Sequence, residues 1–363
     1  MRPAAVALVI LDAFPHGPPT RELTPALYSL AQSGGWAPAG GRAVLSASTY
    51  PNHATFLTGV DPIEHGILTS HALVEDGFRP AQEVGPGAPT LFEACREADR
   101  RAVGVFGDQN LVGVCGARAA DAHWPPDGVL AEGVARGALG FAADAAVLGA
   151  LDEVEVDTAD LLVVQLDEVD TARHLHGPDA PEALDQCRAT DAAFGELLTR
   201  LEARWPEIVV IALSDHDHEA VASGAIDLAA ETRARGLEVL VDHDGTAALV
   251  AGRVEERVLL ELPGVVQAAR LGDERTLVWG EPGQQFGIDW GLKGQHGSPR
   301  TARQLVVVGG GHPSAAVLAR QLEALAPAAA GWAGRIRDLM GLPPARSVTQ
   351  DRKERASADA RAR

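Results

Sequence analysis

Residues 161–178 read LLVVQLDEVDTARHLHGP. The first six residues are a nearly continuous apolar run, which is typical of a strand buried on both faces of a parallel sheet. Asp167, Asp170 and His174 follow the run. If that segment is helical, Asp170 and His174 lie four residues apart on one face. The stretch therefore predicts a buried strand that delivers acid and histidine side chains to its carboxyl end.

Four similar apolar runs occur elsewhere, at residues 4–11, 102–106, 208–213 and 304–308. Helical patterns lie between them, for example at 89–101 and 184–204. This alternation predicts a layered α/β sandwich with its site at the carboxyl ends of the strands. The run at 4–11 ends in Asp12 and lacks a small-residue cleavage site, so it is predicted to be the first strand and not a signal peptide.

A different pattern covers residues 217–289, where strand-like runs flank Asp242-His243-Asp244-Gly245, a sequence typical of a hairpin turn. A helix at 254–262 and strands at 265–269 and 276–279 are expected to follow. We therefore predict a catalytic core formed by residues 1–216 and 290–345, with a small α+β insertion at 217–289. The arginine-rich residues 346–363 are predicted to be a disordered tail.

The composition limits the partners. A formal net charge of −19 argues against a nucleic-acid polymer or an anionic membrane surface as partner. The three cysteines form no CxxC pair, so we expect reduced thiols. Because no apolar stretch approaches the roughly 20 residues of a membrane span, we expect a cytoplasmic protein. The sequence leaves the oligomeric state open.

Further candidate site residues stand at four places along the chain. Asp12 follows the first run, Asp215 and His216 follow the run 208–213, and Thr49 and His296 lie in Gly- or Ser-rich segments. Each of these alone has an ordinary explanation, such as a helix cap, a surface pair or a turn. Together they form a mixed Asp/His set that suits zinc or a similar first-row divalent ion.

The order Asp, Thr-x-Pro-Asn-His, Asp-x-x-x-His-x-x-Gly-Pro, Ser-Asp-His and Gly-x-His-Gly resembles the nucleotide pyrophosphatase/phosphodiesterase branch of the alkaline phosphatase superfamily. The resemblance runs from Asp12 to His296 and implies an alkaline-phosphatase-like three-layer α/β/α sandwich with a cap in the 217–289 region. It also implies two divalent metal ions, with zinc expected and manganese or iron as alternatives. One ion would be held by Asp170, His174 and His296, and the other by Asp12, Asp215, His216 and the Oγ of Thr49.

The implied function is a two-metal phosphodiesterase or pyrophosphatase that cleaves a small-molecule phosphate diester or anhydride through a phospho-threonine intermediate. Metal coordination activates a hydroxyl that is otherwise a poor nucleophile, and a helix starting near Pro51 would aim backbone N–H groups at the phosphoryl oxygens. Three alternatives stay open. They are carbon–phosphorus hydrolysis of the phosphonoacetate hydrolase type, transfer to an alcohol as in a phosphotransferase or mutase, and metal binding without turnover.

The chain departs from the family pattern in three places. Ser70 stands where an asparagine usually donates to a phosphoryl oxygen, so we expect Ser70 to act there as a shorter donor. Ala13 follows Asp12 where glycine is common, and Asp217-His218 follows Ser-Asp-His where glycine is also expected.

Several further side chains have two interpretations. Tyr50 and Lys293 are candidates for substrate contacts, although the position of Lys293 favours a solvated loop lysine. Asp167 is an alternative to Asp170 as a ligand. We expect His218 and His243 to be solvated more often than functional, and His53 to tie down loops beside the nucleophile.

Overall fold

The structure is a computed structural model that describes residues 3–154 and 156–345, so the predicted tail at 346–363 lies outside the described residues. At its centre lies a seven-stranded sheet, counted over the described part of the chain, in the order β2-β19-β9-β1-β8-β6-β7. The strands are β1 (Ala5–Leu11), β2 (Gly35–Trp36), β6 (Ala102–Phe106), β7 (Ala122–Trp124), β8 (Leu161–Leu166), β9 (Ile208–Leu213) and β19 (Val306–Gly309).

Strand β1 occupies the middle of this sheet and pairs in parallel with β8 on one side and β9 on the other. After β1 the chain forms the edge strand β2, continues to β6 and β7 on the opposite side of β1, returns to β8, and then crosses to β9 beyond β1. The carboxyl ends of β1, β8 and β9 therefore meet where the strand order changes direction. In open α/β sheets this is the place where ligands bind.

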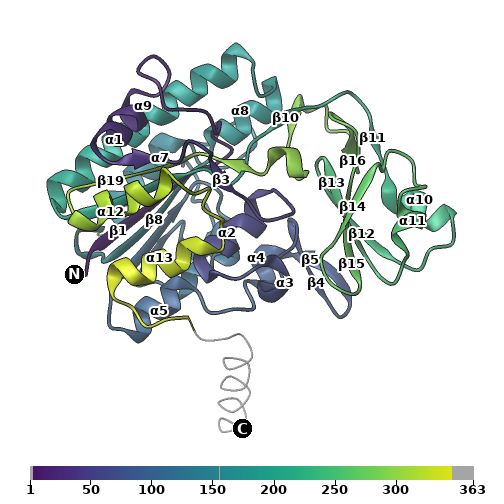
Figure 1. Cartoon of the computed structure of the whole chain (residues 1–363), viewed down its shortest axis with the longest axis horizontal. Coiled ribbons are helices and arrows are strands. Elements are labelled where there is room, and N and C mark those ends of the chain that lie inside the picture. The colour runs from purple at the N-terminus through teal and green to yellow at the C-terminus, as the bar shows by residue number, and fades with distance from the viewer. Residues whose placement is uncertain (1–2, 155, 346–363) are drawn as a thin grey trace, which may run out of the picture.

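Alternate residues of the central strands pack on opposite faces, as the period of two requires. Leu8, Ile10 and Ile211 belong to one core cluster and Val9, Leu11 and Val210 to the other. The first cluster includes residues of α2 (Thr49–Thr58), α5 (Leu91–Glu97), α6 (Leu111–Val114), α12 (Pro313–Leu322) and α13 (Gly331–Met340). The second includes residues of α1 (Pro25–Ser33), α7 (Asp144–Glu153) and α9 (Pro181–Arg204), which lie on the other side of the sheet in Figure 1. The predicted three-layer α/β/α sandwich is thus confirmed.

Residues 217–289 contain a second sheet with the order β12-β13-β15-β14, and all its pairings are antiparallel. Its strands are β12 (Leu240–Asp244), β13 (Ala247–Ala251), β14 (Gln267–Arg270) and β15 (Arg275–Trp279), and it lies to one side of the central sheet in Figure 1. Helices α10 (Leu228–Ala234) and α11 (Glu256–Leu259) contribute to a separate core cluster with this sheet. A further cluster packs Leu249 and Leu277 of the same sheet against Leu68, so the sheet also contacts the part of the chain that precedes it.

Four sequence predictions differ from the structure. The run at 304–308 was predicted as a parallel strand, but β19 pairs antiparallel with β9. Asp242 to Asp244 are strand residues, and the hairpin turn is Gly245-Thr246, where Gly245 has a φ of 67°. The predicted helices at 89–101 and 254–262 are shorter, at Leu91–Glu97 and Glu256–Leu259. An apolar run carries no direction, and local propensity places helix ends to within a few residues.

Among residues 3–154 and 156–345, no helix is long and apolar enough to cross a membrane. Cys95, Cys115 and Cys187 are free and buried, as predicted for reduced thiols.

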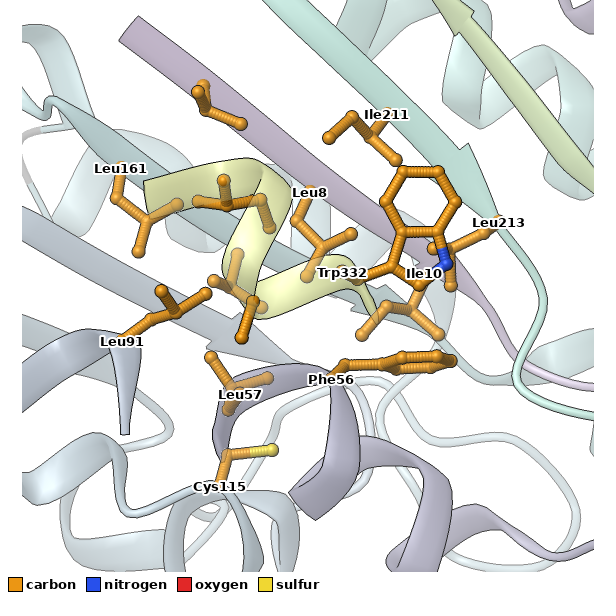
Figure 2. Packing of buried hydrophobic residues seen from close by; sticks show 14 of the residues in the cluster. Leu8, Ile10, Phe56, Leu57, Leu91, Cys115, Leu161, Ile211, Leu213 and Trp332 are labelled. Carbon is orange, nitrogen blue, oxygen red and sulfur yellow. The ribbon is translucent and has the colours of Figure 1, made fainter. Parts of the chain in front are cut away.

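The largest fully buried side chain is Trp332 of α13, which lies in the cluster that also holds Phe56 of α2 (Figure 2). We expect Trp332→Ala to lower the free energy of unfolding by about 3–5 kcal/mol, because it leaves a large cavity beside α2. The measurement is urea unfolding followed by circular dichroism. Trp290→Ala is the matched control, since Trp290 is 73% exposed, and it should change stability by less than about 0.5 kcal/mol. Equal effects of the two substitutions would contradict the predicted packing.

Candidate metal centre

The acids predicted from the sequence come together at the carboxyl ends of the central strands. Asp12 follows β1, and its backbone N–H donates to the carbonyl of Leu166 at 2.9 Å. Asp215 stands two residues after β9, and Asp170 lies in α8 (Glu168–His176), which follows β8. All three carboxylates are buried. Parallel pairing in register therefore places three carboxylates from distant parts of the chain around one point.

Thr49 is the first residue of α2, with Ser48 as the N-cap in an extended conformation. This places the start of the helix two residues earlier than the sequence indicated. The Oγ1 of Thr49 lies 3.1 Å from Nε2 of His216. The nucleophile predicted from the sequence thus sits at a helix N-terminus, where unpaired backbone N–H groups favour an anion.

Near Thr49, Asp12 belongs to two groups of potential ligands, one with Asp170 and His216 and the other with His53 and Asp215. The Nε2 of His216 lies 3.3 Å from Oδ2 of Asp215 and 3.7 Å from Oδ1 of Asp12. Within the described residues, those two carboxylate oxygens are buried without a hydrogen-bond partner. The Nδ1 of His216 lies 3.2 Å from the carbonyl of Asp217, to which it donates a hydrogen bond. The lone pair of Nε2 then faces Asp12 and Asp215.

A third group consists of Asp170, His174, His218 and His296, whose ligand atoms all lie within 4.8 Å of one another. The Nε2 of His174 lies 3.3 Å from Oδ2 of Asp170, as the four-residue spacing on α8 predicted. The Nδ1 of His174 donates to the carbonyl of Gly294 at 2.9 Å. That residue belongs to β17 (Gly294–Gln295), which pairs with β10 (Glu219–Ala220) and brings His296 to the site.

The electrostatics of the site suit divalent cations. Burial, with the neighbouring charge of Asp215, raises the pKa of Asp12 well above its usual range. Burial also lowers the pKa of His296 well below its ordinary value, and burial and His174 lower that of His218 to about 3. The His218 and His296 imidazoles are therefore neutral, each with a lone pair available, whereas the neighbouring carboxylate of Asp170 raises the pKa of His174. Neutral imidazoles and carboxylates around unpaired oxygens are a donor set that fits zinc or a similar ion.

A buried ion pair holds the segments that carry these ligands. Nη2 of Arg173 lies 2.6 Å from Oδ1 of Asp217, and Nη1 of Arg173 donates to the carbonyl of Ala13 at 2.5 Å. Ala13 in turn donates its N–H to Oδ1 of Asp215 at 3.0 Å and has a φ of 51°. Arg173 thus joins α8 to the loop after β1 and, through Asp217, to the segment after β9. The sequence showed Asp217 only as a departure from glycine.

The other candidates named from the sequence have varied surroundings. Ser70 is exposed, and its Oγ donates to Oδ1 of Asp244 at 3.3 Å. The hydroxyl of Tyr50 accepts from Nδ2 of Asn110 at 2.8 Å. Lys293 is exposed, and its backbone N–H donates to the carbonyl of His174 at 2.7 Å.

The structure also gives the contacts of three further residues that the sequence analysis considered, His53, Asp167 and His243. His53 lies on α2, and its Nδ1 donates to the carbonyl of Thr49 at 2.9 Å. Asp167 accepts a hydrogen bond from Thr171 at 3.0 Å, and among the described residues it belongs to none of the potential metal-binding groups, which supports the choice of Asp170. His243 accepts a hydrogen bond from the backbone of Leu228 at 3.1 Å within the insertion.

Sequence reasoning missed Asp244 of β12. This buried carboxylate accepts hydrogen bonds from the hydroxyls of Ser46 and Ser48, the latter at 2.7 Å, in the loop directly before Thr49. Ser48 and Asp244 are 196 residues apart, so no local pattern could have indicated the contact.

The chain matches the family model described as type I phosphodiesterase / nucleotide pyrophosphatase over residues 6–268. It belongs to this family. A similar curated protein is an uncharacterised pyrophosphatase/phosphodiesterase of Schizosaccharomyces pombe, which is 29% identical over 227 residues. The match covers 59% of this chain and 44% of that protein, so the chain spans less than half the length of this relative.

Solved structures of this phosphodiesterase family and a neighbouring enzyme share the fold. An inactive variant of murine ectonucleotide pyrophosphatase/phosphodiesterase 5 in complex with AMP matches with a TM-score of 0.69 at 15% identity, over 94% of this chain and 96% of that one. Phosphonoacetate hydrolase of Sinorhizobium meliloti in complex with phosphonoformate matches with a TM-score of 0.67 at 17% identity, over 93% and 96%. The alkaline-phosphatase-like fold predicted from the sequence is therefore confirmed.

Next to the nucleophile helix, His65 ends the short helix α3 (Pro62–His65) and braces α2. Its Nδ1 accepts from the N–H of Ile67 at 3.2 Å, and its Nε2 faces Oγ1 of Thr55 at 3.0 Å. Both contacts use the neutral ring, and burial lowers the pKa of His65 to about 3.

We expect this histidine to make folding stability fall as the pH drops below about 6.5, because the unfolded chain binds a proton there that the folded chain excludes down to pH about 3. From pH 7.5 to pH 5.5, the wild type should lose about 1 kcal/mol more unfolding free energy than His65→Asn. Urea unfolding at the two pH values measures the difference. His176→Asn, an exposed site on α8, should keep the wild-type slope. Parallel slopes for wild type and His65→Asn would contradict the prediction.

Proposed function

We propose that this chain is a two-metal phosphodiesterase or pyrophosphatase that hydrolyses small-molecule phosphate diesters or anhydrides through Thr49. The observation that carries the proposal is the position of Oγ1 of Thr49, at the N-terminus of α2 and 3.1 Å from Nε2 of His216. His216 is itself in contact distance of the buried carboxylates of Asp12 and Asp215. A hydroxyl placed among metal-ligand groups and at a helix N-terminus has the surroundings that a phosphoryl-accepting nucleophile needs.

The proposed ligands fall into two sets that share the carboxyl edge of the sheet. Asp12, Asp215, His216 and Thr49 would hold one ion, and Asp170, His174 and His296 the other. Bound divalent ions supply positive charge that stabilises the threonine alkoxide and the phosphoryl oxygens. We propose zinc as the ion, since carboxylate and imidazole donors match its preferences, with manganese or iron as alternatives.

The chain's own groups would perform the remaining work. Oγ1 of Thr49, having lost its proton, forms a bond to phosphorus as the bond to the leaving-group oxygen breaks. This gives phospho-threonine, and the leaving-group oxygen takes up a proton. Water then attacks phosphorus, and the Thr49 Oγ1–phosphorus bond breaks to return the hydroxyl. The free N–H groups of the first turn of α2 stabilise the negative phosphoryl oxygens throughout. In this scheme Ser70 donates to a phosphoryl oxygen only after leaving its contact with Asp244, and Tyr50 and Lys293 are candidates for substrate contacts.

The first test concerns the nucleophile. Thr49→Ala should lower kcat for bis-p-nitrophenyl phosphate about 10³-fold or more while both metals still bind, because the hydroxyl is one ligand among four in its set. Thr49→Ser should retain measurable turnover. Thr58→Ser, on the same helix but at its far end, is the control and should match the wild type.

Acid quenching during turnover followed by mass spectrometry should detect a phosphoryl group on the peptide containing Thr49. Removal of metal with a chelator should abolish turnover, and readdition of zinc should restore it. Full activity in Thr49→Ala would overturn the covalent route and favour direct attack by water.

The second test concerns the substrate class. We expect kcat/KM for bis-p-nitrophenyl phosphate to exceed that for p-nitrophenyl phosphate by at least about tenfold, or ~1.4 kcal/mol of transition-state binding. A monoester carries an extra negative charge that needs another cation at the site. Arg173 is already engaged with Asp217 and Ala13, and Arg42, the arginine closest to Thr49 in sequence, is exposed in β3 (Gly41–Arg42).

The same preparation should be assayed with phosphonoacetate and with added acceptor alcohols. Release of acetate from phosphonoacetate, or formation of new phosphate esters, would favour the carbon–phosphorus hydrolase or the phosphotransferase instead. A tenfold preference for the monoester would contradict the diester assignment.

A further inference from the structure

His218 lies inside the third ligand group, although the family pattern has no histidine at its position. Its side chain is completely buried, and its Nε2 lies 2.8 Å from Oδ1 of Asp170. Its backbone N–H donates to Oδ1 of Asp217 at 2.7 Å, so the ion pair with Arg173 also fixes the position of His218. Both the ring and the backbone of this residue are therefore held in place.

The distances in the group distinguish ligands from hydrogen-bonded neighbours. Two atoms that share a tetrahedral ion at about 2.05 Å each lie about 3.3 Å apart. Oδ2 of Asp170 and Nε2 of His174 are 3.3 Å apart, as are Oδ2 of Asp215 and Nε2 of His216. The 2.8 Å between His218 and Asp170 is shorter and matches the distance of a charge-assisted hydrogen bond.

The two oxygens of Asp170 thus have different partners. Oδ2 faces His174, while Oδ1 faces His218. A hydrogen bond from the Nε2–H of His218 would occupy Oδ1. Oδ2 would then be the single oxygen of Asp170 that is directed at an ion. A carboxylate limited to one oxygen takes one coordination position, and catalytic metal sites need a position left open for substrate.

The surroundings of the ring agree with this arrangement. A Cβ added to Gly294 would lie 2.4 Å from the carbonyl oxygen of Arg173 and 3.0 Å from Nδ1 of His218. Glycine therefore lets β17 approach both α8 and the His218 ring. The 2.8 Å contact places Oδ1 of Asp170 to accept a hydrogen bond from Nε2 of His218.

Resting on the proposed function, we infer that His218 is a positioning residue that donates a hydrogen bond from Nε2 to Oδ1 of Asp170 and holds Asp170 as a one-oxygen ligand of the second ion. Hydrogen-bond partners of ligands of this kind typically change metal affinity by about 10- to 100-fold when they are removed. The inference adds His218 to the site without adding it to the ligands.

The test is titration of the metal-free full-length protein with Co²⁺, which is followed by visible absorption and by counting the shifted imidazole N–H signals in proton NMR. Wild type should bind two ions and show three ligand histidines, His174, His216 and His296. His218→Phe removes the donor and should still bind two ions with three ligand histidines. One of the two dissociation constants should rise about 10- to 100-fold.

His218→Gln supplies an amide donor of similar reach and should restore the affinity to within about threefold of wild type. His176→Phe, at an exposed position of α8, is the matched control and should bind Co²⁺ as the wild type does. If His218→Phe does not fold, the wild-type histidine count and the His218→Gln affinity still decide the question.

Four histidine signals in the wild type would make His218 a ligand and overturn the inference while leaving the two-metal proposal intact. Unchanged affinities in His218→Phe would also overturn it alone. Binding of fewer than two Co²⁺ ions by the wild type would overturn the two-metal proposal, and this inference with it.

Discussion

Burying several carboxylates at one point is the constraint on which the rest of the structure depends. Asp12, Asp170 and Asp215 come from three neighbouring strand ends, and each is removed from water. An ionised carboxylate in such surroundings is costly unless charge or hydrogen bonds compensate it. The chain supplies only part of the compensation, such as the amide of Gln165 on Oδ2 of Asp12 at 2.8 Å. The remaining unpaired oxygens are the reason that the site is best understood as a place for cations.

The parallel sheet alone does not fix these acids, because each lies in a loop or helix beyond its strand. Arg173 links three of the segments, since it contacts the loop after Asp12, stands on α8 between Asp170 and His174, and pairs with Asp217. A buried ion pair contributes little net stability, but removing one partner leaves an uncompensated charge. The role of the Arg173–Asp217 pair is to hold the segments that carry the proposed ligands in fixed positions relative to one another.

Whether a feature of this site could be predicted from the sequence depended on how far apart in the chain the interacting residues are. The strand at 161–166 and the pair Asp170 and His174 are local patterns, and the structure places them as expected. The antiparallel direction of β19 and the contact of His218 with Asp170 depend on how distant segments meet. Neither leaves a periodicity or a spacing in the chain. Asp217 and His218 were visible as departures from a glycine pattern, but their partners were not.

Contacts between distant segments also determine how residues 217–289 relate to the site around Thr49. The seven proposed metal-site residues, Thr49 included, all stand outside this segment, whereas Asp244 from its first hairpin accepts hydrogen bonds from Ser46 and Ser48. Ser48 is the N-cap of α2, so a shift of that hairpin would displace the segment that carries Thr49. Asp242, on the same strand as Asp244, makes a similar contact, with its Oδ1 3.1 Å from Nδ1 of His71. These contacts couple the position of the segment's first hairpin to that of the loop before Thr49. Loss of the Asp244 carboxylate would remove the acceptor that orders the loop before Thr49.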